Sequence, residues 1–244
     1  MGDSYSWVRW KAANSLAELK DARAVEPLIA ALKDEHQEIR QQAVYALGEI
    51  KNTLAVEPLV AIALKDVNAN MRMEAKNAYK KIGEPSVELF VTTLKDSDAE
   101  VRKRAVEALW EIKDSRAILP LIAVLNDTAP IVRGNALKAV VSICDTCAVV
   151  PLINALRDSD HSIRLESVNS LWKIKDARVV GPLIAALKDE HEEIRRQAIY
   201  ALGEIKDTLA VEPLISALRD SDRNIRLEAV NSLWKIKGVN PKFS

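Results

Sequence analysis

The stretch DEHQEIRQQAVYALGEIK (Asp34–Lys51) returns almost unchanged as DEHEEIRRQAIYALGEIK (Asp189–Lys206). The two copies lie 155 positions apart, which is five times 31. A fixed period of this length is the signature of a repeat protein, in which each repeat packs only on its neighbours. Aligned at this period, the chain divides into a half repeat, seven full repeats and a C-terminal tail, which span residues 3–20, 21–51, 52–83, 84–113, 114–144, 145–175, 176–206, 207–237 and 238–244.

The sequence pattern within each repeat predicts two helices joined by a short turn. In the repeat that starts at Asp21, this Asp is a predicted N-cap, and residues 24–33 carry apolar side chains at helical spacing. A second helix follows the turn, with residues such as Ile39 on its apolar face and small residues such as Ala43 that let a paired helix approach. Neither helix is apolar all round, so the repeats must stack to cover their remaining hydrophobic edges. We therefore predict an all-α solenoid that forms a single domain over residues 3–237.

An Asp and an Arg lie six residues apart in every repeat. An Asp in the turn can accept hydrogen bonds from amides at the start of the second helix, and the Arg one turn further can reach that Asp or its neighbour. We interpret the pairs as a structural ladder of alternating charge along the solenoid. They are Asp3 and Arg9, Asp34 and Arg40, Asp66 and Arg72, Asp96 and Arg102, Asp127 and Arg133, Asp158 and Arg164, Asp189 and Arg195, and Asp220 and Arg226.

A helix pair with Pro in the first helix, Asp in the turn and Arg in the second helix resembles the HEAT repeat. The pattern PLIAALKDxxxxIRxxAxxALGxI, taken from residues 27–50, is similar to the short subtype known as PBS-lyase HEAT-like repeats. The resemblance covers essentially all of residues 3–237. It implies a right-handed superhelix of stacked antiparallel helix pairs, in which the second helices line the concave surface.

The outward positions of the second helices change chemistry from repeat to repeat, whereas the remaining positions are nearly constant. Mixed aromatic, apolar and charged groups on a rigid face suit protein recognition, for which Tyr, Trp and Arg are the usual anchors. We therefore expect a non-catalytic scaffold that binds a protein partner on its concave face; the alternative is that these are solvated positions free to vary. The expected contact residues are Trp10, Gln41, Tyr45, Met73, Asn77, Lys103, Glu107, Lys138, Leu165, Asn169, Arg196, Tyr200 and Asn231.

The composition argues against several other partners. Lys plus Arg and Asp plus Glu both number 35, and this balance gives no general attraction to nucleic acid or to an anionic membrane. No apolar run approaches the roughly 18 residues of a membrane span, and the first residues contain no apolar signal-peptide segment. We expect a cytoplasmic protein without a cofactor, whose partner is neither nucleic acid nor a membrane.

Candidate metal and redox chemistry is sparse. Cys144 and Cys147 form a CxxC at the junction of two repeats, but a zinc site needs four ligands, and no second CxxC or His pair is present. A redox CxxC usually opens a helix in a βαβ context, which this sequence lacks. We interpret the two cysteines as incidental and the histidines at positions 36, 161 and 191 as exposed turn residues, and we expect no metal site.

Enzymes with this type of repeat provide the alternatives. Deoxyhypusine hydroxylase, a di-iron enzyme, carries His-Glu pairs at the start of second helices, and the matching positions here, such as Gln41-Gln42, contain no His. That activity is therefore excluded on ligand count. DNA-binding glycosylases need a cationic groove, which the mixed charges disfavour. A phycobilin lyase-like subunit, or a subunit of another protein-modifying complex, remains the alternative on fold analogy alone.

Two further expectations concern packing. The half repeat supplies a second helix without its partner, so Trp7 at one end of the stack and Ile236 at the other are predicted to be partly uncovered. Either the chain is part of a longer array, or its ends associate, for example end to end with other copies. Trp172 stands where the neighbouring repeat has Gly203. We expect the large Trp to lean over the small Gly.

Overall fold

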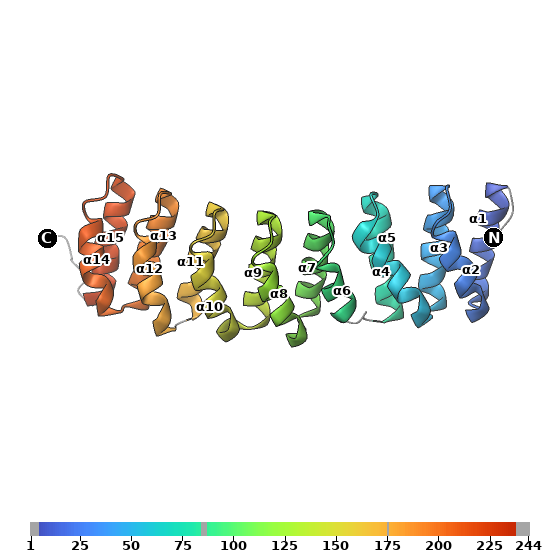
Figure 1. Cartoon of the computed structure of the whole chain (residues 1–244), viewed down its shortest axis with the longest axis horizontal. Helices are drawn as coiled ribbons and strands as arrows, with labels where there is room; N and C mark the ends of the chain where they lie inside the picture. The colour runs from blue at the N-terminus through green and yellow to red at the C-terminus, as the bar shows by residue number, and fades with distance from the viewer. Residues whose placement is uncertain (1–4, 84–86, 175, 238–244) are drawn as a thin grey trace. The chain divides into compact units, whose positions relative to one another are not determined.

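The structure is a computed structural model that describes residues 5–83, 87–174 and 176–237, and within these ranges all regular secondary structure is helical (Figure 1). It divides into two compact units, residues 1–105 and 106–244, with the boundary inside α7 (Ala99–Ile112). Asp3, the start of the predicted repeat 84–113 and the tail 238–244 lie outside the described residues. The division into repeats stays a prediction, and we use it below to name neighbouring helix pairs.

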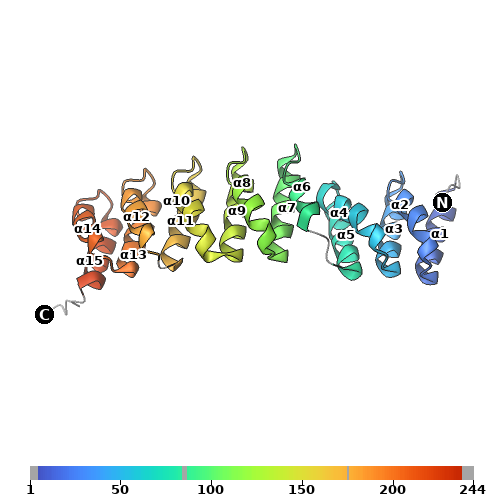
Figure 2. The same cartoon turned by 60° about the horizontal axis from the view of Figure 1, so that its bottom comes forward.

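The N-terminal unit consists of second helices that lie side by side, with shorter first helices packed against them. α1 contacts α3, α3 contacts α5, and α4 packs on α5, as Figure 2 also shows. In chain order the elements are α1 (Ser6–Leu19), η1 (Ala22–Ala24), α2 (Val25–Ala31), α3 (Gln37–Ile50), η2 (Thr53–Ala55), α4 (Val56–Lys65), α5 (Ala69–Ile82), α6 (Val87–Thr93) and the first part of α7.

The C-terminal unit has the same construction. The second helices α9, α11, α13 and α15 contact one another in succession, and α8, α10, α12 and α14 each pack on the helix that follows. After the last part of α7, the elements are η3 (Ser115–Ala117), α8 (Ile118–Val124), α9 (Pro130–Ile143), α10 (Asp145–Ala155), α11 (His161–Ile174), η4 (Ala177–Val179), α12 (Val180–Ala186), α13 (Glu192–Ile205), η5 (Thr208–Ala210), α14 (Val211–Ala217) and α15 (Arg223–Lys237).

Most junctions between repeats use one local motif. α3 ends at Lys51, which adopts a left-handed conformation (φ 57°) and donates its N–H to the carbonyl of Leu47. The next residue, Asn52, accepts the N–H of Leu54 at 3.0 Å and so opens the 3-10 turn that leads into α4. Asp21 caps the preceding junction in the same way, which confirms its predicted role as an N-cap.

The core is formed by the predicted apolar faces. Ile39, Ala43 and Leu47 of α3 are at most 1% exposed, and Leu28 of α2 is fully buried. Burying each large aliphatic side chain stabilises the fold by about 1.5–3 kcal/mol. Ala43 is fully buried, and its small side chain leaves room for the paired helix to approach.

Arg164 connects two successive turns of the C-terminal unit. Its Nη1 donates to the main-chain carbonyls of Asp158 at 2.9 Å and Ser159 at 3.4 Å, in its own repeat. Its Nε donates to Oδ2 of Asp189 at 2.8 Å, in the following repeat. The side chains of Arg164 and Asp189 are only 9% and 10% exposed, so the ion pair is largely shielded from water.

The same contacts recur along the unit. Arg133 and Arg195 reach Asp158 and Asp220 through Nε at 2.8 and 3.0 Å, and both also donate to carbonyls of their own turns. Each receiving Asp is held in turn by a backbone amide two residues on, as when Asp158 accepts the N–H of Asp160 at 2.8 Å. The predicted ladder is therefore present between these repeats, with each of these Arg side chains paired to the Asp of the next repeat.

In the N-terminal unit the same kind of link joins Arg9 to Asp34, with Nε–Oδ2 at 2.7 Å. The hydrogen bond from Arg9 lowers the pKa of Asp34 from 3.8 to about 2, and an N–H from His36 at 2.9 Å adds to this effect. At Asp96 the cation is Lys65, at 2.7 Å, which likewise lowers the pKa of the carboxyl.

Two glycines mark the closest approach of successive second helices. A Cβ built on Gly48 would lie 3.0 Å from the Cβ of Ala78, and one on Gly203 would lie 2.7 Å from the Cβ of Ser232. The Ser232 hydroxyl is itself held, because it donates to the carbonyl of Ile199 at 3.0 Å. These positions therefore require Gly for packing rather than for backbone conformation.

The expectation that Trp172 leans over Gly203 is wrong. The atoms nearest to a Cβ at Gly203 belong to Ser232, and the Trp172 ring instead meets Tyr200 edge to face, with centroids 5.7 Å apart and planes at 87°. Small residues on the facing helix fill the space at the glycine, so no large ring is needed there.

Replacing Gly203 by Ala should lower the free energy of unfolding by about 1–3 kcal/mol, because α13 and α15 must separate to admit the methyl group. Gly181, in α12, provides the matched control: a Cβ there meets nothing within 4 Å. Gly181→Ala should raise the free energy of unfolding by up to about 1 kcal/mol. Urea denaturation followed by circular dichroism measures both, and equal effects at the two glycines would contradict the packing described here.

The low pKa of Asp34 predicts a specific dependence on pH. Its stabilising contribution is complete above the unfolded value of 3.8 and is lost as the pH falls towards the folded value of about 2. Asp34→Asn should be less stable than the wild type at neutral pH. Between pH 3.8 and about 2 it should lose less stability than the wild type does. Asp207→Asn is the control, since Asn52 shows that an amide can cap the equivalent turn. The test is to measure the urea midpoint of unfolding as a function of pH. Equal slopes for Asp34→Asn and the wild type between pH 3.8 and about 2 would refute the lowered pKa of Asp34.

Candidate functional site

The thirteen predicted contact residues all lie on second helices, and none of them is buried. Met73 on α5 and Tyr45 on α3 are among the most open, at 58% and 54% exposed. The structure brings several of them together in grooves that run between successive second helices.

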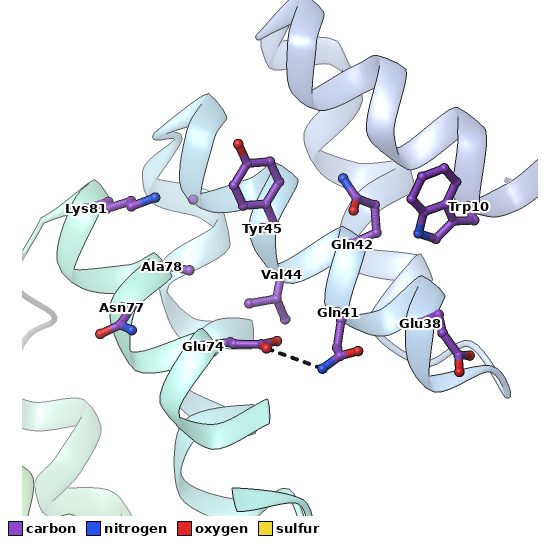
Figure 3. Close-up of a pocket in the computed structure, with 11 residues that line it drawn as sticks. Trp10, Glu38, Gln41, Gln42, Val44, Tyr45, Glu74, Asn77, Ala78 and Lys81 are labelled. Atoms are coloured by element: carbon purple, nitrogen blue, oxygen red, sulfur yellow. Dashed lines mark hydrogen bonds between the residues drawn. The ribbon is translucent and has the colours of Figure 1, made fainter. Parts of the chain in front are cut away.

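The first groove lies in the N-terminal unit and has a volume of about 540 Å³. Trp10 forms its wall on α1, Gln41 and Tyr45 line it from α3, and Asn77 lines it from α5 (Figure 3). Gln41 donates through Nε2 to Oε1 of Glu74 at 3.3 Å, which links α3 to α5 along one side of the groove. Four of the predicted residues therefore belong to one site.

An ordered ion pair borders this groove. Lys81 lies with Nζ 5.7 Å from the centre of the Tyr45 ring and 2.8 Å from Oε1 of Glu49. Lys20 donates to the other oxygen of this carboxylate, Oε2, at 3.3 Å. The hydrogen bond from Lys81, followed by that from Lys20, lowers the pKa of Glu49, and Glu49 raises the pKa of Lys81. Tyr45 thus stands beside a fixed cation, which holds its ring at the surface.

The C-terminal unit contains the same arrangement. Lys235 lies 4.6 Å from the centre of the Tyr200 ring and 2.7 Å from Oε1 of Glu204. Tyr200 and Glu204 each lie 155 residues after Tyr45 and Glu49, so the stretches that return in the sequence carry the same tyrosine with the same kind of ion pair, although Tyr45 is exposed and Tyr200 is half-buried. We call these two sets the tyrosine sites; each consists of a Tyr, a Lys and a Glu.

A second groove, of about 670 Å³, lies between α9 and α11. It brings together the predicted residues Lys138, Leu165 and Asn169. Ile131, which is 51% exposed, adds an apolar side chain at the start of α9. Lys138 also lines a smaller adjoining groove of about 360 Å³.

The remaining predicted residues lie outside these grooves. Arg196 is held by Glu193 one turn earlier in α13, at 2.7 Å, and Asn231 is exposed on α15. Lys103 and Glu107 are half-buried on α7, where Lys103 approaches Glu100 at 3.4 Å.

Sequence reasoning missed several groove residues. Glu74 and Lys81 in the first groove and Ile131 in the second do not belong to the two outward columns that the repeat alignment singled out. The signal was available, because Lys81 follows Asn77 by four residues and therefore lies on the same face of its helix.

In the part of the chain that the structure describes, no three side chains of His, Cys, Asp or Glu gather closely enough to hold a metal ion, and no helix there has the length and apolar character to cross a membrane. Two of the turn histidines do come together: the rings of His161 and His191 stack with centroids 4.5 Å apart, because the turns of adjacent repeats are neighbours.

The cysteines differ from their predicted role. Cys144 and Cys147 form a disulfide, and Cys144 is the N-cap of α10. The interpretation of two incidental cysteines is therefore wrong, since the helix start brings residues three apart into bonding distance.

A sequence model of HEAT repeats matches residues 1–80, 87–151 and 149–234. The chain belongs to the HEAT-repeat family. The PBS-lyase subtype is a resemblance within that family. A search among curated proteins found no match.

Three solved structures illustrate what this chain is similar to. The Escherichia coli protein YibA is 25% identical, with a TM-score of 0.53, over 95% of this chain and 89% of that one. An engineered protein is 24% identical, with a TM-score of 0.51, over 96% of this chain and 76% of that one. The CpcE–CpcF complex of phycocyanin lyase from Nostoc is 20% identical, with a TM-score of 0.43, over 87% of this chain and 94% of that one. The first two support the helical-repeat fold, and none of the three carries an activity over to this chain.

Proposed function

We propose that this HEAT-repeat chain is a non-catalytic scaffold that binds a protein partner along the outward face of its second helices. The observation that carries the proposal is the recurrence of the tyrosine site, with Tyr45 in one unit and Tyr200 in the other. An aromatic ring held at the surface by a neighbouring ion pair loses little conformational entropy on binding, which suits it to anchor a partner.

The grooves provide the second line of support. The volume of each main groove, about 540 and 670 Å³, falls in the range that holds a small ligand or a few side chains of a peptide. Both are lined by apolar groups, aromatic ones in the first groove and aliphatic ones in the second, together with charges of both signs, as at Glu74 with Lys81 and at Glu166 with Lys138. Such mixed linings match peptide side chains better than a phosphate backbone, which calls for cations alone.

A peptide-display selection on the intact chain tests this proposal. Peptides enriched on the wild type should bind Tyr45→Ala and Tyr200→Ala at least tenfold more weakly, because each substitution removes an aromatic anchor that contributes about 1.4 kcal/mol or more to binding. Binding of purified peptides, measured by isothermal titration calorimetry, gives the fold-change.

Leu54→Ala and Leu209→Ala are the matched controls. They also lie 155 positions apart and are 66% and 70% exposed, but they belong to the 3-10 turns η2 and η5 rather than to second helices. Their affinities should equal that of the wild type. Peptides that lose binding to the leucine variants and keep it with the tyrosine variants would place the site elsewhere.

A further inference from the structure

The junction at Cys144 departs from the motif used at other junctions. Four junction lysines adopt φ between 51° and 60°, whereas Cys144, at the equivalent position, has an extended backbone with φ −153°. It ends α9 and caps α10 directly, and its Sγ accepts the N–H of Cys147 at 3.2 Å. The sulfur thus takes the capping role that an Asp or Asn oxygen has elsewhere.

The two sulfur atoms have different surroundings. Cys147 is exposed and lines a groove of about 500 Å³ beside α8 and α10, whereas Cys144 is half-buried. Cys144 Sγ lies 3.7 Å from Oγ1 of Thr146, whose hydroxyl donates towards it. Backbone amides at a helix N-terminus and a hydroxyl donor both stabilise negative charge on a sulfur atom.

We propose that Cys144 and Cys147 form a redox site that exchanges disulfides with thiols of peptides or proteins. An incoming thiolate attacks Sγ of Cys147, a new sulfur–sulfur bond forms there, and the Cys144–Cys147 bond breaks. Cys144 leaves as the thiolate that the Cys147 amide and Thr146 hydroxyl stabilise. A second thiolate then attacks the incoming sulfur and releases Cys147, so two thiols become one disulfide and the protein gains two electrons and, on protonation, two protons.

The groove beside Cys147 indicates the class of the incoming thiol. Its walls include the exposed Val150, together with Pro151 and Ile122, and it carries the polar groups of Asn154 and Arg157. Apolar walls with a few polar groups suit a peptide that bears a cysteine. The groove lies mainly on the first helices α8 and α10, and of the lining of the second groove it shares only Ile163.

A purely structural role explains the pair less well. A disulfide stabilises mainly by closing a loop in the unfolded chain, and the effect grows with loop length. Cys144 and Cys147 are separated by three positions, so the loop is very short. The helix start also already fixes the two residues in this geometry.

Glutathione, a small peptide thiol, is the probe for the first test. The oxidised full-length protein is mixed with glutathione, the reaction is stopped with acid, and mass spectrometry with fragmentation between the two cysteines locates the mixed disulfide. We expect glutathione on Cys147 in at least tenfold excess over Cys144. Predominant attachment to Cys144, or cysteines that stay reduced in excess oxidised glutathione, would overturn the proposal.

A second test concerns Thr146 as a positioning residue. The equilibrium constant for reduction in glutathione buffers should fall about three- to tenfold in Thr146→Val, because the leaving thiolate loses its hydroxyl donor, and Thr146→Ser should restore it. Thermal unfolding of the oxidised variants controls for folding. An unchanged constant in Thr146→Val, or a loss that Thr146→Ser shares, would contradict the assigned role.

Discussion

The arginine that joins one turn to the next is the interaction on which the rest of this structure depends. In the C-terminal unit, Arg164 holds the carbonyls of its own turn with one nitrogen and the carboxylate of Asp189 with another. A planar guanidinium can satisfy both partners only if the two turns keep a fixed separation. In this unit the stack is therefore held at its turn edge by charge pairs shielded from water, and the outward positions of the second helices remain free to vary.

Because the turn edge fixes the stacking, the same repeat fold can carry different outward surfaces. Gly48 faces Ala78 and Gly203 faces Ser232, so the close helix contacts use small residues of different chemistry. On the outer face, the first groove has an aromatic wall at Trp10, and the second has an aliphatic one at Ile131. Packing constrains the inner positions, whereas the outer ones carry the variation that a binding surface needs.

The sequence predicted the helix pairs and the Asp–Arg ladder because both are encoded by short spacings within a repeat. It left open which Asp each Arg reaches, since Arg164 and Asp189 belong to different repeats and meet only after stacking. The place of Lys81 beside the groove was predictable from its position one turn after Asn77, whereas its ion pair with Glu49 on another helix forms only after stacking. The Cys144–Cys147 bond was missed because the CxxC was judged only as part of a zinc site or of a βαβ redox motif. In the structure, the start of α10 brings the two sulfur atoms together.

The most direct test of the ladder is a double-mutant cycle on Arg164 and Asp189, with Arg164→Ala, Asp189→Ala and the double variant unfolded in urea. Because the pair is shielded from water and joins two repeats, we predict a coupling free energy of about 1.5–3 kcal/mol. A coupling below about 0.5 kcal/mol, the value typical of exposed ion pairs, would mean that apolar packing alone sets the spacing of the repeats.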